Sequence, residues 1–131
     1  MDWDQAGPLA AVPVSPGEVL SHYLFRKELR ADGTVKAEAV VPYPHEALSV
    51  TRHRDLTEEE VWECGAVVAN KQGRTLFGRA DFVAAALPDG LSANTSDPPR
   101  NHADILGWPS ERSAPLAQAQ RLSEVCRGIL R

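Results

Sequence analysis

The stretch that organises this chain is ALSVTRHRDLTEEEVWECGAVVANKQGRTLFGRADFVAAAL, residues 47–87. Its apolar pattern predicts a strand over 47–54, a helix over 56–72 and a strand over 74–83. The helix is the clearest in the sequence, because Thr57 and Glu60 have the spacing of a capping box. The same stretch holds the densest group of polar side chains, so we expect the fold and any site to be built around it.

The flanking segments complete a small α+β pattern. They predict a helix over 15–30, a strand over 34–41, a short strand over 91–95 and a helix over 113–130. The first helix is expected from Ser15-Pro16-Gly17-Glu18, a capping serine followed by proline and, three residues on, glutamate. Together these elements predict a small, mostly antiparallel sheet of about four strands, with about three helices packed on one face.

The composition is that of one ordinary globular domain. The chain has 131 residues, of which 43% are hydrophobic and 24% charged, enough for a single core. We expect an extended or mobile arm over residues 1–14, in which Trp3 is an anchor, and one domain over 15–131. The formal net charge of −4 argues against a general duplex-DNA binder.

Cysteine usage favours a reducing compartment. Cys64 and Cys126 lie in predicted helices, and neither belongs to a CxxC pair, so both are interpreted as small buried hydrophobes. The N-terminus lacks the pattern of a signal peptide, and no apolar run is long enough to span a membrane. Arginine outnumbers lysine eleven to three, which is typical of a GC-rich bacterial genome. These features predict a bacterial cytoplasmic protein.

The first polar group that can recognise a ligand is Arg52-His53-Arg54. On an extended segment the two arginines point the same way and His53 points to the other face. Two guanidinium groups on one face suit a phosphate or a carboxylate. The alternative is local ion pairing with Asp55 or with the acidic start of the following helix.

The second group is Arg79 and Asp81, which share one face of a strand because they are two residues apart. They can pair with each other structurally, or position a ligand at a cleft.

The third group is His102 and Asp104, an imidazole and a carboxylate that align on extended backbone. Such a pair can orient a general base or supply two metal ligands. The alternative is an exposed His102 beside an Asp104 that caps a turn.

No sequence motif specifies a reaction. The sequence has no GxGxxG, GxxxxGKS/T, HExxH or GxSxG, so we expect no cofactor and no metal. We expect an accessory protein that binds a partner protein or a phosphate-bearing ligand through Arg52, His53, Arg54, Arg79 and Asp81.

Two alternatives remain open. One is a small enzyme acting on a nucleotide or nucleic-acid phosphate, with His102 and Asp104 as the acid–base pair and the arginines as stabilisers of negative charge. The other is an inhibitor-like protein that acts through the acidic residues 58–63.

Overall fold

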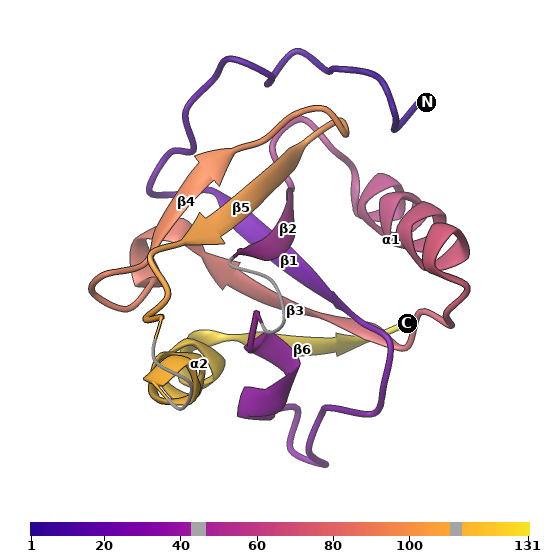
Figure 1. The fold of residues 1–131 in the computed structure, drawn as a ribbon. Helices are drawn as coiled ribbons and strands as arrows, with labels where there is room; N and C mark the ends of the chain where they lie inside the picture. Colours follow the sequence, from indigo (N-terminus) through magenta and orange to yellow (C-terminus); the bar gives the residue numbers. More distant parts are fainter. Residues whose placement is uncertain (43–46, 111–113) are drawn as a thin grey trace.

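One antiparallel sheet forms the centre of the molecule (Figure 1). The computed structural model describes residues 1–42, 47–110 and 114–131. Within them six strands are arranged in the order β4-β5-β2-β1-β3-β6. The strands are β1 Val19–Leu24, β2 Leu48–Arg52, β3 Gly78–Val83, β4 Ser92–Thr95, β5 His102–Leu106 and β6 Arg127–Leu130. The helices are α1 Glu58–Gln72 and α2 Ala114–Val125, with the short 3-10 turns η1 Ala37–Val40 and η2 Ala84–Ala86.

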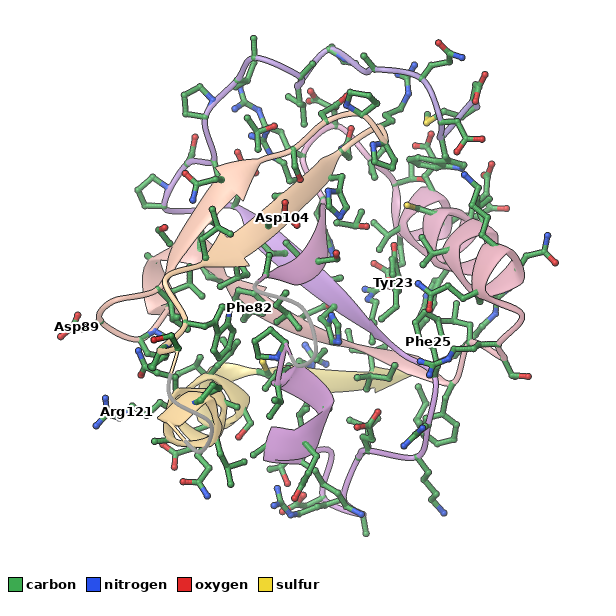
Figure 2. The ribbon with its side chains drawn as sticks, viewed as in Figure 1. Tyr23, Phe25, Phe82, Asp89, Asp104 and Arg121 are labelled. Carbon is green, nitrogen blue, oxygen red and sulfur yellow. The ribbon has the colours of Figure 1, made fainter. Side chains whose placement is uncertain are left out.

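The two α-helices cover opposite faces of the sheet (Figure 1). Successive side chains on a strand point to opposite faces. Leu20 and Leu24 therefore join the main core beneath α2 and η1, whereas Tyr23 packs with Cys64 of α1. Figure 2 shows the same division, with Tyr23 near α1 and Phe82 near α2. The expectation of helices on one face is thus wrong, since each face is covered separately.

The predicted helix over 15–30 is wrong, because this segment contains β1, the strand between β2 and β3. Only half of the capping box forms: the Ser15 N–H donates to the Glu18 carboxylate at 3.0 Å, whereas the Glu18 N–H donates to the Ser15 backbone carbonyl at 3.1 Å and not to the serine hydroxyl. They close a turn that leads into a strand. Both faces of β1 are covered, so apolar residues stand on both of them, and Val19, Leu20, Tyr23 and Leu24 also have the spacing of one helix face.

Two other predicted elements differ from those in the structure, and the numbers of strands and helices differ as a result. Residues 34–41 contain an isolated bridge between Leu29 and Val35 followed by η1, not a strand. The final helix ends at Val125, and β6 follows it. Its proposed start at Ser113 lies outside the described residues. The described chain therefore has six strands where about four were expected, and two α-helices where about three were expected.

The central prediction is confirmed. Residues 47–87 form β2, α1 and β3 in that order. Thr57 caps α1 with both hydrogen bonds of a capping box, and Gly73 ends it in the left-handed conformation with φ 64°. The short strand expected over 91–95 is β4. None of the helices in the described ranges has both the length and the apolar character required to cross a bilayer.

The N-terminal segment runs over the body as irregular chain, seen along the top of Figure 1. Trp3 is only 4% exposed and packs with Tyr23 and Cys64. Its indole N–H donates to Glu63 at 3.3 Å. Leu9 is also buried, so two apolar side chains hold the segment against the domain.

Candidate functional site

A row of polar residues crosses the α1 face of the sheet. His102, Thr51, Ser21, Asp81 and Arg127 occupy paired positions on β5, β2, β1, β3 and β6. Helix α1 covers the part of this row near Thr51, whose hydroxyl lies 3.6 Å from the Cys64 sulfur. The polar residues on β1, β3 and β6 form the candidate site.

Arg79 is the centre of this site. Its side chain is 2% exposed, and its guanidinium lies 4.5 Å from the centroid of the Trp62 ring. The Nε and Nη2 groups donate to the Asp81 carboxylate at 3.0–3.2 Å, and Nη2 also lies 2.6 Å from Glu58 Oε1. Burial alone would lower the pKa of Arg79, but the two carboxylates raise it, so the group stays charged.

One nitrogen of Arg79 is left without a partner. Nη1 is buried and has no hydrogen bond from the residues that the structure describes. A guanidinium has five N–H groups, and two of them belong to Nη1. An unsatisfied buried donor costs about 1–3 kcal/mol, more when it is charged, and an acceptor reaching Nη1 would recover part of that cost.

His53 belongs to the same group of side chains through Ser21. The Ser21 hydroxyl donates to Asp81, and Ser21 Oγ lies 2.5 Å from His53 Nε2. A hydroxyl has a single proton, and Asp81 receives it, so the bond with His53 requires that Nε2 carry a proton. Nδ1 of His53 is then an acceptor to which no described residue donates. Burial lowers the pKa of His53, although Asp81 acts in the opposite direction, so the imidazole is neutral near pH 7.

This arrangement is not that of a serine hydrolase. The Ser21 hydroxyl donates its proton to Asp81 and not to His53, so no base is placed to activate its oxygen. In a catalytic triad the serine and the aspartate bind opposite nitrogens of the histidine. Here Ser21 lies between the other two, and His53 Nε2 is 3.9 Å from Asp81. Ser21 therefore positions the imidazole.

A pocket of about 990 Å³ lies against these residues. Its polar part contains three arginines, two carboxylates and one histidine: Arg30, Arg79, Arg127, Glu58, Asp81 and His53. Its apolar part includes Val83, Val125 and Leu130, which are 40%, 43% and 61% exposed. Apolar side chains exposed beside a buried charged group are typical of a binding pocket.

Arg52 does not belong to this pocket. It is fully buried, and its five N–H groups all donate within the protein. Nε and Nη2 bind Glu18 at 2.8 and 2.6 Å, and the remaining donors reach the carbonyl oxygens of Leu9, Val12 and Pro13. Arg52 therefore fixes the N-terminal segment and has no donor left for a ligand.

Arg54 lies beside the pocket. Its side chain is 43% exposed, and Nη1 is 3.6 Å from Glu18. It lines a neighbouring hollow that shares Val19 and His53 with the main pocket. The expected pair of parallel guanidinium groups is thus divided between a buried structural arginine and an exposed one. Of the five residues expected to bind ligand, the structure brings His53, Arg79 and Asp81 together.

His102 and Asp104 lie elsewhere on the same face. Neighbouring strands are about 4.8 Å apart, so β5 and β3, three steps apart in the sheet order, are separated by about 14 Å. His102 hydrogen-bonds the Ser96 hydroxyl, and its Nε2 is 3.9 Å from Asp104 on β5 (Figure 2). Burial lowers the pKa of His102 despite Asp104. This pair does not line the pocket of Arg79.

Sequence reasoning missed four residues that surround Arg79 and Asp81: Ser21, Glu58, Trp62 and Arg127. Ser21 and Arg127 were assigned to helices, although both lie on strands. Glu58 was assigned to the acidic start of the helix and to an inhibitor-like acidic surface, and Trp62 lies outside the three predicted polar groups. The available signal was the strand alternation of residues 19–24, which places Ser21 and Tyr23 on one face.

Neither a metal centre nor a known relative identifies the site. Across residues 1–42, 47–110 and 114–131, no group of three or more His, Cys, Asp or Glu side chains is placed to hold a metal ion. The chain matches no protein-family model, and comparison with curated proteins and with solved structures gives no match. The interpretation of the pocket therefore rests on its own geometry and chemistry.

Proposed function

We propose that this protein is a small binding protein that recognises an anionic group, on a free ligand or on a partner protein, in the pocket around Arg79. The observation that carries the proposal is Arg79 Nη1, a buried donor with no partner in the described residues, on a side chain that lines the pocket. Arg30 and Arg127 line the same pocket and add positive charge. We propose the cytoplasm as its location, which the free thiols of Cys64 and Cys126 support.

Ligand-induced stabilisation tests this proposal. The probes are inorganic phosphate, acetate, hexanoate and hexyl phosphate, each added to purified protein in a thermal-unfolding assay at low salt. A ligand at 100 times its dissociation constant adds about 2.7 kcal/mol of stability, which shifts the melting temperature by roughly 10 °C in a domain of this size. Each variant is compared with its own ligand-free melting temperature.

Three arginine variants locate the binding site. Arg79→Gln should lose the stabilisation, and Arg127→Gln, which alters an exposed wall, should reduce it. Arg121→Gln is the matched control, because Arg121 lies on α2 and points away from the body (Figure 2). The proposal fails if no probe stabilises the wild-type protein, or if the effect persists unchanged in Arg79→Gln and Arg127→Gln.

A small enzyme is the second candidate, and His53 is the observation that favours it. Its imidazole lines the pocket of Arg79, is fixed by Ser21 and Asp81, and keeps Nδ1 free as a base. A positioned base beside a guanidinium is the usual combination for proton transfer with stabilisation of negative charge. In this candidate His53 replaces the pair His102 and Asp104, because that pair does not line the pocket.

Turnover of p-nitrophenyl phosphate and p-nitrophenyl acetate tests the second candidate. His53→Gln should abolish turnover and leave anion binding intact, whereas His102→Gln should leave turnover unchanged. If His102→Gln abolishes turnover and His53→Gln does not, the catalytic base is His102 on β5. Failure of the wild-type protein to convert either substrate faster than the buffer would remove the support for catalysis.

A further inference from the structure

We infer that the pocket takes a monocarboxylate that carries an apolar group, in preference to a phosphate. The inference rests on the proposed function and names the chemistry of its ligand. Three features of the pocket carry it: the number of free donors on Arg79, the sum of the charges, and the apolar wall.

The free donors of Arg79 lie on a single nitrogen. Nε and Nη2 are occupied by Asp81, and Nη2 also by Glu58. The bidentate edges that a guanidinium presents to phosphate or carboxylate require two neighbouring nitrogens. Only the two N–H groups of Nη1 remain, and Nη1 is fully buried in the free protein. Arg79 can therefore bind one oxygen of a small acceptor once the side chains that cover Nη1 move aside, and it cannot form a second fork.

The charges around Arg79 limit the charge of the ligand. Arg79 lies between two carboxylates, so this inner group is negative by one unit before a ligand enters. Arg30 and Arg127 bring the formal charge of the lining to one positive unit. A carboxylate brings the total to zero, whereas a phosphate dianion brings it to minus one and faces Asp81 and Glu58 at short range.

The apolar side chains that line the pocket indicate that the ligand has an apolar part. Val83, Val125 and Leu130 line the pocket and are all exposed. An amphipathic ligand can contact both parts of the pocket: its charged end pairs with the arginines, and its apolar end covers the exposed apolar side chains and removes their surface from water. The same chemistry is offered by a free aliphatic or aromatic acid and by a protein C-terminus that ends in an apolar residue.

Four matched probes separate the three features, with calorimetric titration at pH 7.5. Hexanoate is the reference, acetate lacks the apolar body, hexanamide lacks the charge, and hexyl phosphate carries the second charge. Hexanoate should bind about tenfold or more tightly than each of the others, since each fully buried methylene contributes about a fourfold gain in affinity. A second pair, the peptide N-acetyl-Gly-Gly-Leu and its C-terminal amide, distinguishes a protein terminus from a free acid.

Two exposed positions give variants that keep the fold. Leu130→Asn should weaken hexanoate about tenfold and leave acetate unchanged, because it makes the exposed wall polar without adding a charge. Glu58→Gln should strengthen hexyl phosphate more than hexanoate, because it removes one of the two repelling carboxylates. Arg121→Gln is again the control and should change neither probe.

The outcomes divide cleanly. Hexyl phosphate binding as tightly as hexanoate, or tighter, overturns the inference and leaves the proposed function standing. If hexanamide binds as tightly as hexanoate, charge is not recognised, and both the inference and the proposed function are overturned. Both are also overturned if none of the probes binds. Tight binding of the peptide acid with none of hexanoate supports the inference and assigns the carboxylate to a protein terminus.

Discussion

Replacing Arg52 with methionine should destabilise the whole domain. Methionine keeps an apolar stem of similar length but leaves the Glu18 carboxylate, 6% exposed, without the guanidinium that binds it at 2.6 Å. Removing one partner of a buried ion pair costs about 3–5 kcal/mol, because an uncompensated charge remains. A domain of this size is stable by only about 5–15 kcal/mol, so the variant should lose a large share of its stability and about 10–20 °C in melting temperature.

The second consequence of Arg52→Met is local. Three carbonyl oxygens, those of Leu9, Val12 and Pro13, lose their donors, so the N-terminal segment should detach before the sheet unfolds. Urea unfolding followed by far-ultraviolet circular dichroism measures the sheet and helices. Tryptophan fluorescence additionally reports the release of Trp3, which belongs to the segment and is buried against the domain.

The control is Arg54→Met, at a side chain that is 43% exposed and 3.6 Å from the same carboxylate. Exposed ion pairs contribute less than about 1 kcal/mol, so this variant should remain close to wild type. Adding Glu18→Gln to Arg52→Met should recover stability, because it removes the buried charge. If Arg52→Met costs no more than Arg54→Met, the assignment of Arg52 as a structural residue is refuted.

Three further predictions concern pH, backbone packing and thiol reactivity. Burial would raise the pKa of Glu18, but its hydrogen bonds lower it below the ordinary 4.5. The ionised Glu18 therefore stabilises the folded protein fully above about pH 4.5, and this stabilisation is lost as pH falls through the folded-state pKa. The free energy of unfolding measured against pH should fall in this range, and Glu18→Gln should reduce that dependence. Gly78→Ala should cost about 1–3 kcal/mol in chemical unfolding, because its Cβ would lie 2.6 Å from a backbone oxygen of β6, whereas Gly17→Ala has open space and should be neutral. Cys64 is buried and Cys126 half-buried, and burial raises the pKa of the Cys64 thiol and that of Cys126 to about 12. A thiol reagent at pH 8 should therefore react slowly with the folded protein and quickly in urea, and rapid reaction without urea would contradict the raised thiol pKa values.

Residues 47–87 were predictable because their signals are local. A capping box at Thr57 and a glycine at position 73 mark the ends of α1 independently of the rest of the chain. The strand β1 was not predictable in the same way, because its apolar residues serve two faces of a sheet whose partners lie far along the chain. Local capping at Ser15 then favoured a helix that tertiary pairing overrides.

The site was predictable only where it lies within one strand. Arg79 and Asp81 pair as their spacing implies, because two residues on a strand share a face. His53 lies beside Asp81 because Ser21 contacts both of them, and this contact depends on the pairing of β1 with β2 and β3, which the local sequence does not reveal. Arg52 is buried because the N-terminal segment covers it, so its burial could not be predicted from residues 52–54 alone.

The two local hydrogen bonds between Ser15 and Glu18 have a consequence for the course of folding. They can form as soon as these residues meet, whereas the partners of Leu20 on β2 and β3 lie about 30 and about 60 residues further along the chain. Local helix therefore competes with a strand that depends on slow, long-range loop closure. We expect the N-terminal third of the chain to visit non-native helical turns early, and to give them up only when β2 and β3 arrive to pair with β1.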